Sequence, residues 1–243
     1  MKNREEINLL RLIFLQRQNV SHFYMKFEEW EPIYKLILAD MHFDRIYDEN
    51  SARLLSRMLE TKARKKIPDI IEIEILRNAI KGMDVLVCGK APCLKDDIKK
   101  IDSGKYVVIA ADGATSVLMD NGITPDIIVT DLDGNMDDEV KANERGAIMV
   151  VHAHGDNMDA LGEELPRLKR VIGTTQANPN INVYNFGGFT DGDRCVFLAK
   201  EMGARSIVLV GFDFEDKNVT PLKKKKLVWA KKLISMVMGE GNS

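Results

Sequence analysis

The sequence predicts an α/β fold, in which a mostly parallel sheet carries helices on both faces and follows a small α-helical N-terminal region. From Met83 onward, short runs of β-branched residues alternate with helical stretches. The strand-like runs are mostly apolar, as strands buried on both faces are. The chain has 243 residues, enough for one such domain and an appendage. We therefore predict a helical region (1–80), a Rossmann-like catalytic domain (81–216) and a C-terminal helix (217–243).

The first eighty residues are predicted to form short amphipathic helices. The residues expected to begin them are Asn3 with Glu6, Pro32, Ser51, and Asp69 with Glu72. Gly82 is expected to end the last of these helices. No linker rich in Pro, Gly or Ser separates them from Met83. We therefore expect these helices to pack on the sheet domain or across a homodimer.

Seven strands follow, with helices between most of them. The strands are expected at 85–88, 106–109, 127–130, 147–151, 170–172, 182–184 and 206–210, and the helices at 114–121, 136–145, 157–168 and 191–202. In open parallel sheets, ligands bind at the carboxyl ends of the strands. The residues just after each strand are therefore the candidates for function.

Carboxylates follow two of these strands. Asp131 and Asp133 come after 127–130, and alternation along an extended chain puts both on the same side, with Leu132 turned away. Asp112, beside Gly113, follows 106–109. Three carboxylates at neighbouring strand ends suit Mg²⁺, which binds a few carboxylates together with water and substrate phosphates. Helix capping is the alternative for Asp133.

The strand at 147–151 is followed by His152, His154 and Asp156. A His-x-His pair is also compatible with zinc, but no third soft ligand stands nearby, and the hard carboxylates favour Mg²⁺. Asp156 is also suited to the N-cap of the helix at 157–168. We expect Asp131, Asp133, His154 and Asp156 to be catalytic.

Two glycine-bearing loops are candidates for phosphate or heterocycle binding. The first, with Gly89 and Lys90, precedes a predicted helix, whose N-terminus favours anions. The second loop runs from Gly187 to Arg194 and supplies backbone donors, a hydroxyl, carboxylates and a guanidinium. The residues expected to bind the nucleotide are Gly89, Lys90, Asp112, Gly113, Gly188, Thr190, Asp191, Asp193 and Arg194. A turn followed by a helix cap is the alternative for the second loop.

Composition excludes several classes of protein. Residues 81–216 carry 14 basic and 23 acidic side chains, which does not suit a nucleic-acid surface. The three cysteines form no metal-binding or disulfide pattern, which fits a cytoplasmic protein. No apolar run is long enough to cross a membrane. The lysines at 223–226 are interpreted as the solvated face of the C-terminal helix.

The motifs at 111–113, 130–134 and 154–156 resemble, in order and spacing, the metal and nucleotide motifs of thiamin pyrophosphokinases. The closer resemblance is to the archaeal 6-hydroxymethyl-7,8-dihydropterin pyrophosphokinase family, to which 188–194 and 210–213 are also similar. The chain is not expected to contain the C-terminal β-sandwich of thiamin pyrophosphokinases. In the first glycine loop, Ala91 and Cys93 replace a Gly and a Ser of the pterin family's pattern.

The resemblance implies Mg²⁺-dependent transfer of diphosphate from ATP to the hydroxymethyl group of a reduced pterin, with release of AMP. It places the reaction in methanopterin-type or folate-type cofactor biosynthesis, and we expect a homodimer. The alternatives are a metal-dependent nucleotide-sugar glycosyltransferase, a thiamin pyrophosphokinase-like enzyme and a non-catalytic nucleotide sensor. The glycosyltransferase would explain Asp131 and Asp133 but not Asp112 with His154 and Asp156.

Overall fold

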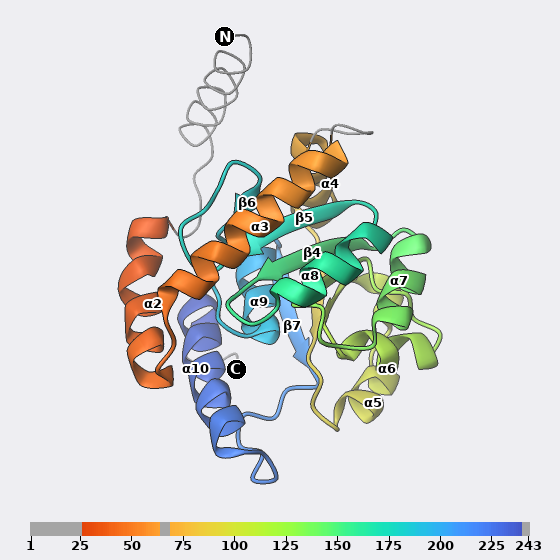
Figure 1. Ribbon diagram of the computed structural model, residues 1–243. Coiled ribbons are helices and arrows are strands. Elements are labelled where there is room, and N and C mark those ends of the chain that lie inside the picture. The colour runs from red at the N-terminus through yellow and green to blue at the C-terminus, as the bar shows by residue number, and fades with distance from the viewer. Residues whose placement is uncertain (1–25, 64–68, 240–243) are drawn as a thin grey trace.

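The computed structural model describes residues 26–63 and 69–239 and contains one seven-stranded sheet (Figure 1). The strands are β1 (Asp84–Cys88), β2 (Val107–Ala111), β3 (Ile127–Thr130), β4 (Ile148–Ala153), β5 (Val171–Thr175), β6 (Val183–Tyr184) and β7 (Ser206–Val210). Their order is β6-β5-β4-β3-β2-β1-β7, and each pair of neighbours is parallel. The predicted α/β class is confirmed.

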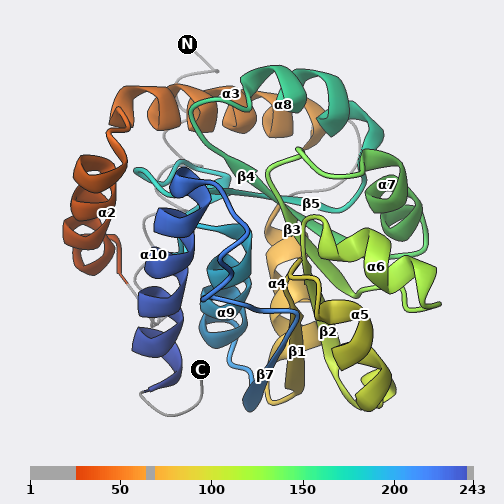
Figure 2. The ribbon, with the colours of Figure 1, turned by 90° about the horizontal axis from the view of Figure 1, so that it is seen from below.

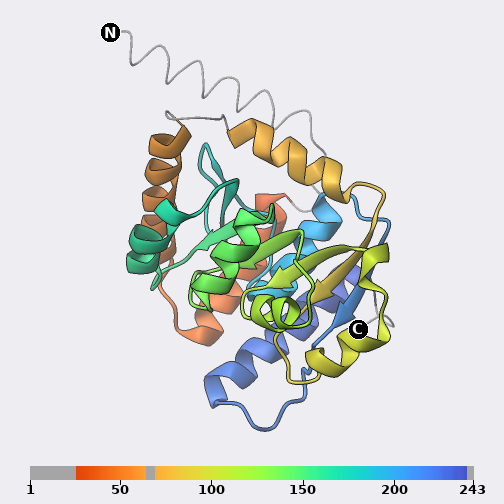
Figure 3. The same cartoon turned by 90° about the vertical axis from the view of Figure 1, so that its right-hand side faces the viewer.

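Helices cover both faces of the sheet. They are α2 (Phe27–Met41), α3 (Arg45–Ala63), α4 (Asp69–Ile80), α5 (Leu94–Asp97), α6 (Ala114–Asp120), α7 (Met136–Glu144), α8 (Met158–Glu164), α9 (Asp191–Glu201) and α10 (Pro221–Met238). Three short 3₁₀ helices join them, at Ile98–Lys100, Ser103–Lys105 and Leu165–Arg167. Figure 2 shows α2, α9 and α10 on one side of the strands and α5, α6 and α7 on the other. Figure 3 shows the same layers with α6 and α7 nearest to the viewer.

The direction in which the chain crosses the sheet decides which face each helix covers. From β1 the chain moves strand by strand to β6, with α6, α7 and α8 on one face. It then returns through α9 to β7, on the far side of β1. Crossovers between parallel strands are right-handed, so the reversal of direction puts α9 on the opposite face. The ends of β1 and β7 thus form a topological switch point, where open α/β sheets bind ligands.

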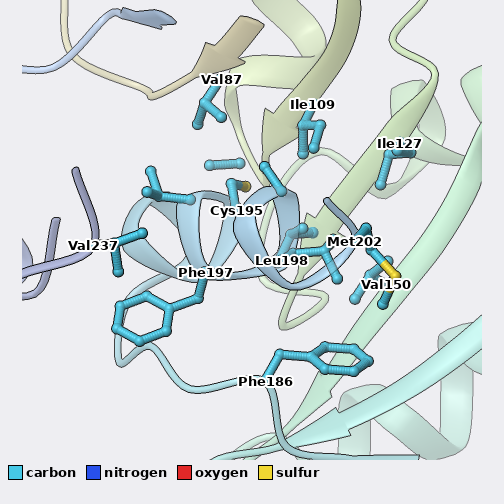
Figure 4. Close-up of a cluster of buried hydrophobic side chains, with 14 of the residues drawn as sticks. Val87, Ile109, Ile127, Val150, Phe186, Cys195, Phe197, Leu198, Met202 and Val237 are labelled. Carbon is cyan, nitrogen blue, oxygen red and sulfur yellow. The ribbon is translucent and has the colours of Figure 1, made fainter. Parts of the chain in front are cut away.

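Each face of the sheet has its own hydrophobic core, because alternate residues of a strand point to opposite sides. Val85 and Val87 of β1 belong to the core beneath α9, whereas Leu86 and Cys88 belong to the core beneath α6 and α8. Figure 4 shows the first of these cores, in which Cys195 of α9 faces Val87 and the Phe197 ring lies on the opposite side of the helix. Apolar residues therefore face both sides of the inner strands, as predicted.

The N-terminal helices share the cores of the sheet. Trp30 and Tyr34 of α2 are buried in the core beneath α9, and the Trp30 and Phe197 rings lie 6.0 Å apart, edge to face. Leu55 of α3 is buried in the other core. The expectation that these helices pack on the sheet domain is confirmed for the described residues. The division into three regions stays a prediction.

Two predicted helix starts are wrong. Pro32 lies inside α2, which begins at Phe27, and Ser51 is buried inside α3. Ser51 is instead fixed by tertiary contact, since its hydroxyl donates to Asn157 Oδ1 at 3.1 Å. α4 begins at Asp69, and Gly82 follows its end with a φ of 74°, as predicted. The helix predicted from Asn3 and Glu6 lies outside the described residues.

Candidate active site

The three predicted metal ligands meet at the carboxyl edge of the sheet. Asp112 follows β2, and Asp131 and Asp133 follow β3. One carboxylate oxygen from each lies within 4.8 Å of the other two. Leu132 points away into the hydrophobic core, 4% exposed, at a φ of 68°. The clustered acids and the turned-away Leu132 are as predicted, but a left-handed turn at Leu132, and not an extended chain, produces them.

A short hydrogen-bond network holds the two acidic loops together. The Thr130 hydroxyl donates to Asp112 Oδ1 at 3.3 Å and accepts from the Leu132 amide at 2.9 Å. The Asp112 amide donates to the Val129 carbonyl at 2.8 Å, and Asp112 has a φ of 38°. Asp112 and Leu132 thus both have left-handed backbone, which costs free energy in residues other than glycine. Backbone strain of this kind is common at functional sites.

Gly134 is the residue that makes room for Asp112, because a Cβ atom there would overlap the Asp112 carboxylate. We expect Gly134→Ala to displace that carboxylate and to weaken Mg²⁺ binding by at least about tenfold, a loss of roughly 1.4 kcal/mol. Isothermal titration with Mg²⁺ measures this. Gly162→Ala in α8 is the matched control, since nothing lies within 4 Å of its Cβ position. Equal Mg²⁺ affinity in both variants would contradict the expectation.

His154 links Asp131 to Asp156. Its Nε2 lies 3.1 Å from Asp131 Oδ2, and its Nδ1 lies 2.6 Å from Asp156 Oδ1. Burial of the ring alone would lower its pKa, but the hydrogen bond and charge of Asp131 raise the pKa of His154 overall. Burial likewise opposes ionisation of Asp131, yet the contacts with His154 hold its pKa at about 2. The pair therefore favours a charged imidazolium against a carboxylate.

Negative charge is crowded around these residues. Burial, followed by repulsion from Asp131 and Asp112, raises the pKa of Asp133 to about 6. Burial and the charge of Asp131 raise the pKa of Asp191, at the start of α9, to about 8. Oδ1 of Asp131 is buried and accepts no hydrogen bond from any described residue. An orphaned carboxylate oxygen among repelling acids fits a hard divalent cation such as Mg²⁺.

Glu139 of α7 is a further acid that the sequence did not reveal. It is 0% exposed, and neither carboxylate oxygen has a hydrogen-bond partner among the described residues. Burial and the neighbouring charge of Asp112 raise its pKa to about 9. In the sequence it is the third acid of the first turn of a helix, a position that is usually exposed. Only its charge interaction with Asp112, the residue after β2, marks Glu139 as part of the site.

The acids open into a cavity of about 840 Å³. Among the predicted site residues, those that line it are Gly89, Lys90, Asp112, Asp131, Asp133, His154, Asp156, Thr190, Asp191 and Arg194. Gly113, Gly188 and Asp193 are not among the lining residues. Lys90 reaches across the cavity wall, with its Nζ 3.8 Å from Asp112 Oδ2. Lys223 and Lys226 of α10, interpreted as a solvated face, also line it.

The buried residues of the second glycine loop hold the loop itself. Asp193 is fully buried, and its carboxylate accepts from the Phe189 and Thr190 amides and from the Thr190 hydroxyl. Arg194 donates to the carbonyls of Gly188 and Phe189 at 3.0 and 2.8 Å. This is the turn and helix cap that the sequence left open as an alternative, whereas Thr190 and Asp191 still face the cavity.

The first glycine loop lies at the switch point between β1 and β7. The Gly89 and Ala91 amides donate to the carbonyls of Val210 and Gly211 at 2.8 and 2.9 Å. A Cβ on Gly89 would lie 2.6 Å from the Gly211 carbonyl oxygen, so the close approach of the two loops requires glycine. The helix that follows, α5, has four residues, too few for a strong N-terminal anion site.

A buried network ties the N-terminal helices to the loop after β4. Asp48 of α3 accepts from the Gly155 backbone amide at 2.8 Å, the Tyr34 hydroxyl at 2.6 Å and the Gln176 side-chain Nε2 at 2.8 Å. Asn157 donates to the carbonyls of Asp131 and His152 at 2.9 and 2.7 Å. Gly155 stands between His154 and Asp156, so α3 helps to fix the backbone that carries both. His152 itself is buried, and burial lowers its pKa well below the usual value.

Comparison with known proteins identifies relatives over most of the chain. Residues 61–219 match the model of the family described as 6-hydroxymethylpterin diphosphokinase MptE-like. A 6-hydroxymethyl-7,8-dihydropterin pyrophosphokinase of Pyrococcus furiosus is 45% identical over 90% of this chain and 97% of its own length. A protein with the same name from Methanothermobacter thermautotrophicus is 41% identical over 90% of this chain and 97% of its own length. Another from Methanocaldococcus jannaschii is 38% identical over 87% of this chain and 95% of its own length.

Among solved structures, the MAf glycosyltransferase of Magnetospirillum magneticum AMB-1 is similar with a TM-score of 0.46 and 17% identity. The match covers 70% of this chain and 34% of that chain. A likeness at this level carries no information about substrate.

Proposed function

This chain belongs to the 6-hydroxymethylpterin diphosphokinase MptE-like family, and on that premise we propose how its cavity performs the reaction. The protein is a pterin diphosphokinase, which transfers a diphosphoryl group from ATP to the hydroxymethyl oxygen of 6-hydroxymethyl-7,8-dihydropterin and releases AMP. The observation that supports the site is the cluster of Asp112, Asp131 and Asp133 at the carboxyl edge of the sheet. It lies in the cavity that the switch-point loops border.

In this proposal the three carboxylates hold Mg²⁺, which when bound neutralises charge on the transferring diphosphoryl group. Asp131 and Asp133 face the cavity from one loop, and Asp112 completes the set from the next strand. Lys90 adds a positive charge 3.8 Å from Asp112 Oδ2, within reach of a bound polyphosphate. Thr190 and Asp191 line the same cavity and are available to the substrates.

His154 and Asp156 serve the acceptor hydroxyl in this proposal. His154 orients Asp131 through its Nε2 and Asp156 through its Nδ1. Asp156 is 91% exposed at the cavity wall. We therefore assign its carboxylate the role of the base that accepts the proton of the acceptor hydroxyl. A loose phosphoryl-transfer transition state needs little help from a base, so positioning is the larger contribution.

We also propose that the product enters methanopterin-type or folate-type cofactor synthesis in the cytoplasm. Over 26–63 and 69–239, no helix has both the length and the apolar character needed to cross a bilayer. The homodimer stays a prediction, which light scattering of the purified chain tests.

The test of the function is a nucleotide-product assay with labelled ATP, Mg²⁺ and a panel of acceptors. We expect AMP to form with the reduced hydroxymethylpterin and not with thiamin or sugars. Release of a nucleoside phosphate from a sugar nucleotide would indicate a glycosyltransferase instead. Tight binding of Mg·ATP with no turnover on any acceptor would indicate a nucleotide sensor.

A further inference from the structure

The cavity extends across several strand ends of the sheet. Its walls come from the loop after β4 at one end and from the loop after β7 at the other. These strands are four places apart in the sheet order, which corresponds to roughly 19 Å at about 4.8 Å per strand. Asp112, Asp131 and Asp133 follow β2 and β3, between the two ends. A metal bound there would face a separate compartment on each side.

The compartment beside β4 is walled by the α2–α3 corner, which we define as residues 42–48. Phe43 and Tyr47 line the cavity and are 42% and 56% exposed, high values for large aromatic side chains. The Phe43 ring lies 6.5 Å from the Phe189 ring of the second glycine loop. Tyr47 lies against the loop that carries the catalytic pair, since a Cβ on Gly155 would be 2.8 Å from Tyr47 Cβ.

The α2–α3 corner is held rigidly although its aromatic rings are exposed. His42 ends α2 in the left-handed region, and the Phe43 amide donates to the Leu38 carbonyl at 3.0 Å. The three hydrogen bonds to Asp48 then fix the start of α3 against the loop after β4. Exposed aromatic rings that line a cavity, on a backbone held by hydrogen bonds, suit the stacking of a flat heterocycle.

The α2–α3 corner offers hydrogen-bond acceptors to a heterocycle. The corner and the loop after β4 contribute Asp44, Asp48 and Asp156 to the cavity lining. The amino and ring N–H donors of a pterin can donate to such carboxylates. Lysines lie towards both ends of the cavity: Lys90 follows β1, and Lys223 and Lys226 belong to α10, whose Lys225 pairs with Asp40 near the end of α2.

The compartment at β7 combines a lysine with aromatic and acidic residues, the acids being Asp213 and Asp216. It lies at the switch point, beside Lys90, and its aromatic residues are Phe212 and Phe214, whose rings are 5.6 Å apart. Nucleotides bind at such switch points in other open α/β sheets. The base and ribose of ATP therefore fit this end, with the phosphates pointing to the acids.

We propose that Phe43 and Tyr47 of the α2–α3 corner bind the pterin ring, and that the compartment of Phe212 and Lys90 binds ATP. This inference rests on the proposed function. It adds an assignment of the half of the cavity that selects the acceptor. It places the hydroxymethyl group beside His154 and Asp156, on the face of the diphosphoryl group opposite the leaving AMP. In-line transfer requires that arrangement. The N-terminal helices are then the part of the chain that determines acceptor specificity.

The test uses the full chain and measures the binding of each substrate alone. The probes are fluorescent 6-hydroxymethylpterin and a non-hydrolysable ATP analogue with Mg²⁺. We expect Phe43→Ala and Tyr47→Ala to raise the Kd for the pterin on the order of tenfold each, the size of an aromatic–base stacking loss, and to change the Kd for the analogue less than about twofold. Phe212→Ala should do the reverse. Tyr47→Phe keeps the ring and should keep the pterin affinity.

Both rings are exposed, so these substitutions should leave the thermal unfolding midpoint close to that of the unmodified chain. If Phe43→Ala and Tyr47→Ala weaken the ATP analogue instead, or change neither Kd, the assignment of the two halves is wrong while the diphosphokinase activity still stands. If the unmodified chain binds the ATP analogue but no pterin, the proposed function and this inference fail together.

Discussion

Turnover should fall by about 10²- to 10⁴-fold in Asp131→Asn and in Asp133→Asn, a loss of roughly 3 to 5 kcal/mol of transition-state stabilisation. Each change keeps the shape of the side chain and removes one negative charge from the cluster of three acids. Stability should fall little, because at least one repulsion disappears: the charge of Asp131 raises the pKa of Asp133. Asp131→Asn also loses its ion pair with His154, so its stability should fall further than that of Asp133→Asn.

The measurements are AMP release at limiting Mg²⁺ and the free energy of unfolding. Leu132→Ala is the matched control between the two acids. Its side chain is 4% exposed in the core, so it should lose about 2 to 5 kcal/mol of stability and keep the Mg²⁺ dependence of turnover. Near-normal AMP release by both Asn variants at limiting Mg²⁺ would remove these residues from the mechanism.

The largest loss of stability is expected from Trp30→Ala, at about 3 to 5 kcal/mol. Trp30 is 1% exposed, packs edge to face on Phe197 and donates to the Gln176 carbonyl at 2.9 Å. Its removal leaves a cavity between α2 and α9 and an unpaired carbonyl at the end of β5. Urea unfolding followed by circular dichroism measures the change.

Leu36→Ala in the same helix is the control, since Leu36 is 62% exposed and should change stability by less than about 0.5 kcal/mol. The two variants together test whether α2 folds as part of the sheet domain. A stable, fully folded fragment of residues 1–80 would contradict that view, because its core residues are buried against the sheet and α9 in the whole chain.

The strands and the three acids could be predicted from sequence because their signals are local. β3 and β7 begin and end where their apolar runs do, at Ile127–Thr130 and Ser206–Val210. Parallel strands bring their carboxyl ends to one edge, so Asp112 and Asp131 had to lie near each other once the fold class was known.

Helix starts in the N-terminal region were harder to predict. Pro32 and Ser51 have the residue types of helix starts, yet both lie inside helices. There the burial of Tyr34 and Leu55 against the sheet outweighs local capping preferences. Propensity contributes tenths of a kcal/mol at such positions, and a buried aromatic side chain contributes several times more.

The sequence by itself thus determined the sheet, its ligand-binding edge and the acids that stand there. Only the tertiary structure decided that Glu139 lies behind Asp112, that Asp48 fixes the loop of His154, and that Lys226 faces the cavity. These residues come from helices whose own sequences give no sign of the site. Their place depends on how each helix is rotated and packed on the sheet, and that is set by the burial of side chains distant in the sequence.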